Sequence, residues 1–541
     1  MSVNYRKDMV VYQIYPRSFL DTNGDGIGDL PGIIAKLDYL QDLGINAIWL
    51  SPIYQSPDDD NGYDIADYKS VDPKFGTMED FDTLIVEAKK RGIGIVMDLV
   101  INHTSDEHEW FQKALAGDPK YQDYYIIREG KNGKLPNNWG NFFAECPWAP
   151  FGDTGKYYLH LFSKKQPDLN WHNPAVLGEV KDILRFWLEK GVMGFRCDVI
   201  NVIYKNSLEN GRPSPILTGM EHYLSTEGCH EILRQLREVL DEYGAFTVGE
   251  TVFVDVPKAK DLTDPERKEL DMVFAFEHME VDQVIVKWFK TWLDPHKLMK
   301  CLAKWQQSLP WNAIYFENHD QPRFISRFTD SENYREKAST MMAGLQMTLR
   351  GTPYIYEGQE IGMTNGDFQD LSQVMDIESH NIWAMAQKLG IPKNLRWKMI
   401  LRTSRDHGRT PVQWDASPNA GFTTGKPWLK VNSNYKKVNV ANELSDDQGI
   451  RAFWKYMIGL RKTEPALIDG DFVPVYMGST IFAYERVTET KRLLIICNLC
   501  GKEKKLPKHL TDWRKVVACN YNSISFDTMR PFEFRLLEET R

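Results

Sequence analysis

The stretch GIVMDLVINH (94–103) indicates the fold class, because it is a continuous apolar run that ends in polar residues. A run of this kind is typical of a strand that is covered on both faces, as in a parallel sheet. Similar runs start near residues 11, 46, 194, 246, 272, 312 and 352. Amphipathic stretches such as 78–92 and 173–191 lie between them, which indicates parallel βαβ units. We therefore predict an α/β fold, a closed (β/α)8 TIM barrel.

Two parts of the chain depart from this alternation. Residues 104–172 are rich in Asn, Gly, Pro, Trp and Tyr and are too long for a plain loop in a compact barrel. Beyond residue 465 the runs DFVPVYMGSTIFAYERV and KRLLIICNL indicate hairpin strands. The predicted organisation is a barrel over 1–103 and 173–465, an inserted domain over 104–172, and a C-terminal antiparallel β-sandwich domain over 466–541.

Composition excludes several classes of function. The chain has 541 residues and a net charge of −9, so it has no general attraction to nucleic acid or to an anionic membrane. Its 7 cysteines are odd in number and irregularly spaced, so we expect no disulfide framework. The N-terminus has no apolar signal region, and no run reaches the length of a membrane span. We expect a cytoplasmic protein without a nucleic-acid or membrane partner.

Polar residues follow several of the predicted strands. They are Asp98, Asn102 and His103 on the third, Arg196 and Asp198 on the fourth, Glu250 on the fifth, and His319 and Asp320 on the seventh. Ionised groups in apolar runs are costly unless they are paired or used in chemistry. The carboxyl ends of barrel strands form the active-site face, so the sequence predicts that these side chains meet in one site.

Three carboxylates on one face favour glycoside hydrolysis with retention of configuration, in which a nucleophile and an acid/base act together. Arg196 lies two residues before Asp198, so both point to the same face, and we expect the arginine to lower the pKa of this nucleophile. Glu250 has no adjacent cation in sequence and is the acid/base candidate. Asp320 would hold the substrate or the developing oxocarbenium charge. The strand-end histidines would donate hydrogen bonds to sugar hydroxyls.

At these residues the sequence resembles a known family. DLVINHTS (98–105), GFRCDVIN (194–201), VGET (248–251) and FENHDQPR (316–323) look like the four signature regions of the α-amylase family, glycoside hydrolase family thirteen. VYQIYPRSFLDTNGDGIGDL (11–30), QPDLNW (166–171) and RTPVQWD (409–415) resemble its oligo-1,6-glucosidase and α-glucosidase branch. The similarity covers nearly the whole chain. It implies a catalytic barrel (domain A) with domain B inserted after the third strand and a C-terminal domain C.

The resemblance also implies roles for individual residues. Asp198 would be the nucleophile, Glu250 the acid/base and Asp320 the transition-state stabiliser. Contacts with the terminal sugar are implied for Asp60, Tyr63, His103, Arg196, His319 and Arg409. Tyr63 would stack on the glucose, while Asp60 and Arg409 would pair at its O4 side and close the pocket, which makes an exo-acting enzyme. Phe162 of the inserted domain is a further candidate for the pocket lining.

The residue after the nucleophile bears on linkage. In this branch a Val there accompanies preference for α-1,6 bonds and a Thr accompanies preference for α-1,4 bonds, and here it is Val199. We therefore expect a retaining α-glucosidase that acts on isomaltose and short isomaltooligosaccharides, with isomaltulose and sucrose also open. The expected partner is a small oligosaccharide, and the chain is expected to be a monomer or weak homodimer.

Other functions stay open within the family. A trehalose-6-phosphate hydrolase would need cations for the phosphate, which Lys205 and the lysines of 287–304 could supply. A sucrose-acting transglucosidase or isomerase shares the same covalent intermediate. A non-catalytic, transporter-associated member would lack a carboxylate and carry a transmembrane helix. Glu317 stands where the family more usually has Asn or Asp, and its effect is not predicted.

The loop DTNGDGIGD (21–29) has the spacing of a calcium-binding segment. Its candidate ligands are the side chains of Asp21, Asn23, Asp25 and Asp29 and the carbonyl of Ile27. Gly26 at the sixth position matches a calcium loop, but position twelve is Gly32 where an EF-hand carries Glu. Similar loops in the resembled branch hold calcium, or sometimes magnesium, far from the catalytic centre. We expect one structural Ca²⁺, with Mg²⁺ as the alternative.

Overall fold

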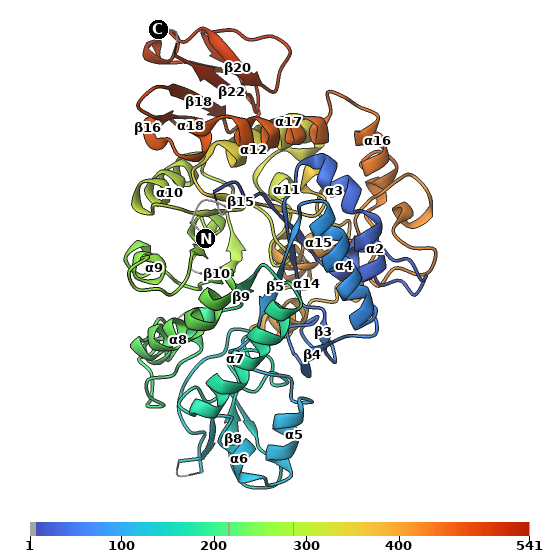
Figure 1. Cartoon of the computed structure of the whole chain (residues 1–541), viewed down its shortest axis with the longest axis vertical. Coiled ribbons are helices and arrows are strands. Elements are labelled where there is room, and N and C mark those ends of the chain that lie inside the picture. The colour runs from blue at the N-terminus through green and yellow to red at the C-terminus, as the bar shows by residue number, and fades with distance from the viewer. Residues whose placement is uncertain (1–6, 132, 215–216, 285, 540–541) are drawn as a thin grey trace.

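A computed structural model of the chain describes residues 7–131, 133–214, 217–284 and 286–539. Its central part is a barrel, with a smaller lobe at one end and a β domain at the other (Figure 1). The eight barrel strands are β1 (Val11–Ile14), β2 (Ala47–Leu50), β5 (Gly94–Leu99), β9 (Gly194–Cys197), β10 (Phe246–Glu250), β11 (Met272–Phe274), β14 (Ala313–Ile314) and β15 (Thr352–Tyr356). Each lies within one of the predicted runs, so the predicted barrel is confirmed.

The barrel strands pair in parallel, in the order β11-β10-β9-β5-β2-β1-β15-β14. The two ends of this order, β11 and β14, are in contact and close the barrel. Because strand side chains alternate between faces, every second residue points into the interior. That interior is an apolar cluster that includes Val11, Trp49 and Val248. Gln13 lies two residues after Val11 on β1, and Glu250 lies two residues after Val248 on β10, so both also point into the interior. The interior therefore becomes polar at the carboxyl ends of the strands.

Helices cover the outside of the barrel (Figure 1). They include α4 (Met78–Lys90), α7 (Pro174–Glu189), α8 (Glu227–Tyr243), α10 (Pro295–Ser308), α12 (Ser331–Thr348) and α17 (Ile450–Thr463). Local signals fix several of their ends. Thr77 and Asp80 form a reciprocal capping box at the start of α4, and Gly244 ends α8 in the left-handed conformation. The helices thereby return the chain to the amino end of the next strand.

The segment between β5 and α7 forms a separate lobe at the lower end of Figure 1. It contains α5 (Glu109–Leu115), α6 (Pro119–Gln122) and a small antiparallel sheet of β6 (Ile127–Glu129), β8 (Lys156–Leu159) and β7 (Trp148–Pro150). His103 and Asp168 form a β-bridge at its base, and the Leu169 N–H donates to the carbonyl of Asn102. The lobe is therefore attached beside the end of the third barrel strand.

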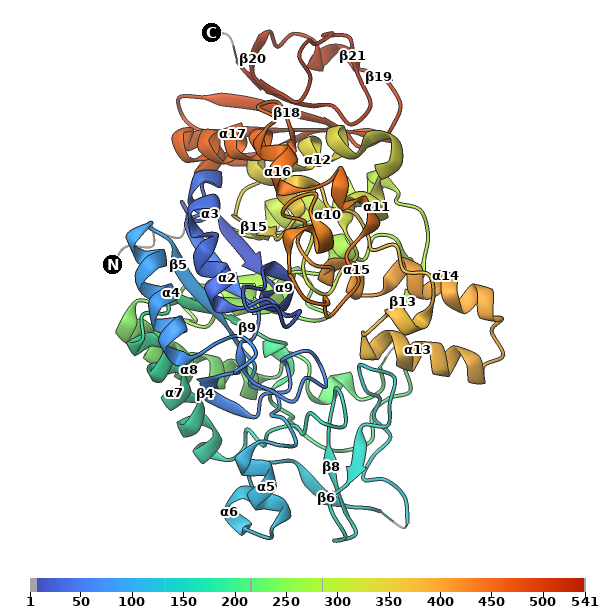
Figure 2. The ribbon, with the colours of Figure 1, turned by 90° about the vertical axis from the view of Figure 1, so that its right-hand side faces the viewer.

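A second projection follows the eighth barrel strand (Figure 2). It consists of α13 (Ile377–Lys388) and α14 (Lys393–Thr403), which lie against each other, with α14 also contacting β13 (Val286–Lys290). The short helix α15 (Asp406–Arg409) then brings the chain back to the barrel. This projection lies within residues 362–445, which show no clear strand–helix alternation in the sequence. Its helices have a local apolar cluster of their own, built around Trp288, Ile382 and Ile400.

The C-terminal part is an antiparallel sheet in the order β16-β17-β18-β22-β20. Its strands are β16 (Asp471–Met477), β17 (Ile481–Val487), β18 (Arg492–Asn498), β22 (Phe534–Glu538) and β20 (Lys515–Cys519). The sheet lies over α12 and α17 (Figure 1), and the predicted C-terminal β domain is confirmed. All 7 cysteines are free thiols. Among the described residues, no helix is both long enough and apolar enough to cross a membrane.

Candidate active site

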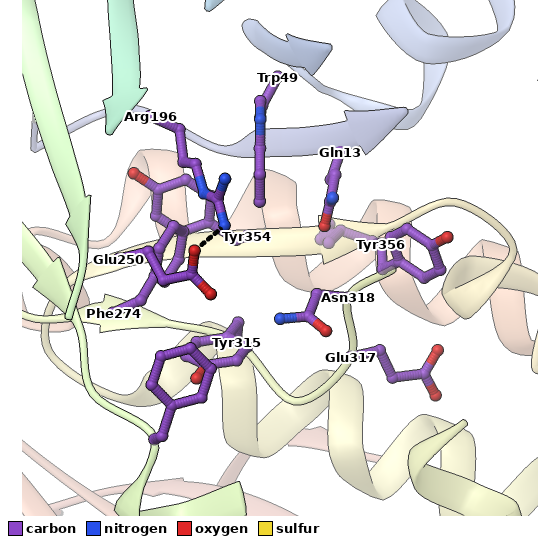
Figure 3. A pocket seen from close by; sticks show the side chains of 12 residues that line it. Gln13, Trp49, Arg196, Glu250, Phe274, Tyr315, Glu317, Asn318, Tyr354 and Tyr356 are labelled. Carbon is purple, nitrogen blue, oxygen red and sulfur yellow. Dashed lines mark hydrogen bonds and ion pairs between the residues drawn. The ribbon is translucent and has the colours of Figure 1, made fainter. Parts of the chain in front are cut away.

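One buried arginine connects three carboxylates at the carboxyl end of the barrel. The Nη1 of Arg196 lies 2.5 Å from Oδ1 of Asp98 and 2.6 Å from Oδ1 of Asp198. Its Nη2 pairs with Glu250, as Figure 3 shows. All four residues are buried. A single positive charge thus faces three acidic groups in a buried site.

The sequence places no cation next to Glu250 along the chain, but the fold brings one beside it. β9 and β10 pair in parallel with Val248 opposite Arg196, which places the guanidinium next to the glutamate. The two residues are 54 positions apart in sequence, so adjacency along the chain could not reveal the pair. The amide N–H of Val199 also donates to Oε2 of Glu250, at 3.3 Å. The candidate acid/base is therefore held from the neighbouring strand.

The expected lowering of the Asp198 pKa by Arg196 is wrong in its net direction. Burial raises the pKa of Asp198 well above its usual range, and the charges of Glu250 and Asp98 raise it further against the opposing effect of Arg196. Burial likewise raises the pKa of Asp98 to about 6, again with Arg196 opposing. One cation faces three carboxylates, so burial and mutual repulsion favour the protonated forms of Asp98 and Asp198. Retaining glycosidases need one protonated and one ionised carboxyl in such a pair.

Val199 adopts an unusual backbone conformation directly after Asp198. Its φ of 33° lies in the left-handed region, which is costly for a β-branched side chain. The side chain is buried in an apolar cluster that includes Trp139 and Leu161 of the inserted lobe. The strained turn points the Val199 amide at Glu250 and its isopropyl group toward the lobe.

The opposite side of the site has a different charge balance. Oδ1 of Asp320 lies 2.8 Å from Nη2 of Arg409 and 3.4 Å from Nη1 of Arg405, and Oδ2 lies 3.2 Å from Nε2 of His319. Burial alone would raise the pKa of Asp320, but these neighbours and Arg196 outweigh it and hold the pKa well below the usual range. Asp320 therefore remains ionised.

The expected pair between Asp60 and Arg409 does not form. Asp60 pairs with Arg405 at 3.2 Å, and Arg405 also pairs with Asp376 at 2.8 Å. Arg409 instead donates from Nε to the carbonyl of His319 at 2.8 Å and contacts Asp320. The two arginines lie four residues apart at α15, so both reach the same side, and only the tertiary packing decides which one meets Asp60. Burial raises the pKa of Asp60 to about 6, with Arg405 opposing.

Tyr63 and His319 form an aromatic stack in the site. Their ring centroids are 5.2 Å apart with an interplanar angle of 4°, and Tyr15 stacks on the same histidine at 5.9 Å. The hydroxyl of Tyr63 donates to Oδ2 of Asp98 at 3.2 Å. The predicted sugar-stacking residue is thus fixed by the acid cluster at one end and by His319 along one face.

His103 is held by protein atoms on both ring nitrogens. Nε2 lies 3.0 Å from the carbonyl of Tyr63, and Nδ1 lies 3.2 Å from the amide nitrogen of Asn102. The amide oxygen of Asn102 accepts from Lys205 at 2.7 Å, which orients the amide so that it donates to the histidine. Burial lowers the pKa of His103 to about 4, so the ring is neutral. Phe162 packs against it, with the ring centroids 5.3 Å apart.

Sequence reasoning gave no role to several residues of this region. They are Gln13, Gln166, Asp376 and Arg405, whereas Asp98 was expected in the site without a specific role. Gln166 contacts the Tyr63 carbonyl and the His103 ring at 3.1 and 3.0 Å. A polar residue inside an apolar strand run was a usable signal for Gln13 and Asp98. Arg405 and Asp376 gave no such signal, because they come from irregular segments.

The structure shows a role for Glu317, whose effect the sequence did not predict. Its carboxylate accepts from Nη1 of Arg323 at 3.1 Å and from the amide of Phe324 at 2.9 Å. In Figure 3 it points away from Glu250. It therefore neutralises a buried arginine and holds the start of α11 (Phe324–Phe328).

The candidate calcium loop is closed by hydrogen bonds within the chain. Asp21 accepts from the amides of Asn23, Gly24 and Gly26, and Asp29 caps the next helix by accepting from Gly32. Gly26 has a φ of 94°, and a Cβ there would lie 1.9 Å from the carbonyl oxygen of Lys426. In the part of the chain that the structure describes, no three acidic, His or Cys side chains lie close enough together to hold a metal ion.

A (β/α)8 barrel with an acid pair and a third ionised carboxylate at the carboxyl ends of its strands is the arrangement of a barrel glycoside hydrolase. Comparison with known proteins agrees. Residues 13–470 match the model of the alpha-amylase catalytic domain. The chain therefore belongs to the α-amylase family of glycoside hydrolases, and within it to the α-glucosidase branch.

Three relatives illustrate the range of that branch. The oligo-1,6-glucosidase of Parageobacillus thermoglucosidasius is 46% identical, covering 98% of each chain. A variant of the trehalose-6-phosphate hydrolase of Bacillus licheniformis has a structure with a TM-score of 0.94, at 41% identity and 99% coverage of both chains. A variant of the isomaltulose synthase of Erwinia rhapontici, solved with sucrose, also has a TM-score of 0.94, at 38% identity and with 99% and 100% of the chains covered.

Proposed function

We propose that the protein is a retaining, exo-acting α-glucosidase that prefers α-1,6 linkages. The observation that carries the proposal is the Asp198–Arg196–Glu250 arrangement, with the ionised Asp320 on the other side of the site. The charge balance supplies a carboxyl that holds a proton and carboxylates that do not. That division is what a two-step displacement at an anomeric carbon requires.

The mechanism proceeds through a covalent glucosyl-enzyme. An oxygen of Asp198 forms a bond to the anomeric carbon while the glycosidic bond breaks, and the proton of Glu250 passes to the departing oxygen. Water then gives a proton to Glu250 and forms a bond to the anomeric carbon, which releases Asp198. The two inversions restore the α configuration. Asp320, kept ionised by Arg405 and Arg409, stabilises the positive charge that develops on the sugar.

Exo action is supported by the wall around Asp60. This carboxylate is buried and joined to Arg405, which is joined in turn to Asp376. Hydrogen-bonding groups fixed in this way can bind the last hydroxyls of a terminal glucose and leave no room for a further sugar. The wall replaces the Asp60–Arg409 pair expected from the sequence, and it has the same consequence for the chain end.

The α-1,6 preference is supported by Val199 and by the similarity to oligo-1,6-glucosidases. The neighbouring lysines argue against a phosphorylated aglycone. Lys205 pairs with Asp168, Lys287 with Glu378, Lys290 with Asp282, and Lys304 with Glu277. Four of the six lysines offered for a phosphate thus already have a carboxylate partner, and the other two, Lys297 and Lys300, are exposed on α10. A neutral second sugar fits these residues better than a sugar phosphate.

Rates of glucose release from isomaltose, maltose, sucrose and trehalose 6-phosphate, measured side by side, test the proposal. We expect isomaltose to have the highest kcat/KM. Proton NMR of the first product tests the mechanism, and we expect α-glucose before mutarotation. If the phosphorylated sugar alone is cleaved, or if β-glucose appears first, the proposal fails. Turnover of sucrose into an isomer without net hydrolysis would instead favour the transglucosidase alternative.

We also propose that residues 21–29 bind one Ca²⁺. Its support is the donor chemistry, namely the carboxylates of Asp21, Asp25 and Asp29, the amide of Asn23 and the carbonyl of Ile27. Asp21 and Asp29 are buried, and among the described residues neither has an ion-pair partner. Binding would draw these oxygens together and would stabilise the fold without entering the chemistry. We expect EDTA to lower Tm by several degrees and added Ca²⁺ to restore it, with an Asp21→Asn variant insensitive to both.

A further inference from the structure

Gln13 is a buried amide at the inner face of the barrel, next to the active site. It is 1% exposed and lies on β1, two residues after the inward-facing Val11. In the barrel it has Trp49 on one side and Tyr356 on the other. Figure 3 shows its amide pointing from the strand into the pocket that also contains Glu250. A buried amide in such a place needs defined hydrogen-bond partners.

The amide nitrogen of Gln13 has two such partners. It lies 2.8 Å from Nδ1 of His319 and 3.2 Å from Oγ of Ser51. An amide nitrogen carries two N–H groups and no acceptor, so this contact requires that Nδ1 of the histidine be unprotonated. The orientation of the amide and the tautomer of the ring therefore depend on each other.

The other ring nitrogen decides between the two possible orientations. Nε2 of His319 lies 3.2 Å from Oδ2 of Asp320, which is ionised, and it makes no hydrogen bond of its own with the described part of the protein. Burial lowers the pKa of His319 to about 3, so the ring is neutral and carries one proton. A lone pair on Nε2 would face the carboxylate and be repelled. The proton therefore belongs on Nε2, and Nδ1 accepts from Gln13.

We propose that Gln13 is a positioning residue that fixes the Nε2–H tautomer of His319 and so keeps one N–H available for a hydroxyl of the bound sugar. The proposal rests on the glucosidase function given above, because it assigns the donor to the same sugar pocket. Gln13 itself acts through the histidine and through no reacting atom. When the tautomer is fixed before the substrate binds, the N–H donor of His319 does not have to be formed or reoriented during catalysis.

Aromatic stacking cannot select the tautomer of His319. Tyr63 and Tyr15 hold the ring plane of His319, and Trp49 meets it edge-on. Both neutral tautomers have the same shape, so ring packing does not distinguish them. The Gln13 amide does, because it presents a donor to one nitrogen only.

Charged groups around His319 act on the same ring as Gln13. Asp320 favours a proton on the ring, whereas Arg196, Arg405 and Arg409 oppose a positive charge there. Arg409 reaches the backbone carbonyl of the histidine and not its ring. Asp320 at Nε2 and Gln13 at Nδ1 therefore favour the same tautomer from opposite sides of the ring.

The first test is spectroscopic and needs no substrate. The protein is labelled with [¹⁵N]histidine, and the His319 signals are assigned by their loss in a His319→Gln variant. We expect the ¹⁵N shifts of a neutral ring protonated at Nε2 from pH 5 to 8. A ring protonated at Nδ1 overturns the proposal. In Gln13→Glu, whose carboxylate accepts and cannot donate, we expect a proton on Nδ1 and a second proton at mildly acidic pH.

The second test is kinetic and uses p-nitrophenyl α-D-glucopyranoside. Gln13→Met keeps the length of the side chain and removes the donor, and we expect kcat/KM to fall about 10- to 100-fold, as for other residues that orient a functional histidine. Ser51→Ala, which removes the other partner of the same amide, is the matched control and should stay within about threefold. For Gln13→Glu we expect the alkaline limb of the pH profile to move to lower pH, because deprotonation leaves Nε2 bare.

The outcomes separate this proposal from the proposed function. If Gln13→Met loses no more activity than Ser51→Ala while both have the wild-type Tm, the positioning role is refuted. If Gln13→Met does not fold, the spectra of the wild-type protein and of Gln13→Glu still decide the tautomer. A preference for sucrose over isomaltose would overturn the linkage assignment and leave the ¹⁵N result unchanged, because those spectra are recorded on the free protein.

Discussion

The two sides of the active site balance charge in opposite ways. On the β9–β10 side, Arg196 is the cation shared by Asp98, Asp198 and Glu250. On the other side, two arginines and a histidine surround Asp320. Asp98, Asp198 and Glu250 are buried and Asp320 is partly exposed, but burial raises the pKa of both Asp198 and Asp320, so the opposite directions come from the charges around them. The pKa of Asp198 is raised and that of Asp320 is lowered.

This difference shows how one fold can keep a proton and a permanent negative charge a short distance apart. A cation-poor cluster retains a proton that can be passed to a leaving group. A cation-rich cluster keeps a carboxylate ionised so that it can stabilise positive charge on the substrate. Three variants and a pH profile test this contrast and its surroundings, beginning with the largest expected effect.

Removing the nucleophile is expected to have the largest effect. Asp198→Asn keeps the size of the side chain but removes its nucleophilic oxygen, so we expect kcat to fall at least about 1000-fold. Initial rates of glucose release from isomaltose measure the loss, and Tm checks that the fold is intact. A variant that keeps more than a tenth of the wild-type rate would show that another group forms the glucosyl-enzyme. Ser51→Ala, outside the acid cluster, is the control.

We expect the pH dependence of activity to reflect the titration of the Asp198–Glu250 pair and not that of Asp320. The proposed mechanism requires one proton on the Asp198–Glu250 pair. Activity therefore falls at low pH, when a second proton neutralises the nucleophile, and at high pH, when the first proton is lost. Asp320 contributes no limb between pH 4 and 9, because its pKa lies below that range.

The variant Glu250→Gln sharpens this test. With a leaving group that needs no proton, such as 2,4-dinitrophenolate, we expect the alkaline limb of glucosylation to disappear while the acid limb remains. The measurement is the pre-steady-state burst of dinitrophenolate between pH 4 and 9. An alkaline limb that persists unchanged would mean that the retained proton belongs to another group.

The smallest expected effect concerns linkage. Val199→Thr adds a hydroxyl beside the acid pair, and we expect the isomaltose-to-maltose ratio of kcat/KM to fall several-fold, with a stability loss of about 1–2 kcal/mol for a buried hydroxyl. Val202→Thr is the matched control, because Val202 lies in the same apolar cluster. It should lose similar stability and keep the ratio. An unchanged ratio in Val199→Thr would remove the side chain as the basis of linkage preference.

Much of the fold followed from the local pattern of the chain. Buried strands such as 94–103 and 246–250 are continuous apolar runs, and the polar residues at their ends were sufficient to indicate the active-site face. What the pattern missed were partners from distant segments. Arg405 and Asp376 belong to an irregular region without periodicity, and Gln13 met His319 only when the first and seventh strands entered one barrel.

The sequence by itself determined the barrel and pointed to an inserted part, a C-terminal part and three candidate carboxylates, because strand periodicity and polar strand ends are local properties. Only the tertiary structure decided how charge is shared among them. The register of β9 against β10 places Arg196 next to Glu250 as well as next to Asp198. The packing around α15 places Arg405, and not Arg409, against Asp60. A pKa depends on every charge and every layer of protein around a group, and those neighbours come from parts of the chain that are far apart in sequence.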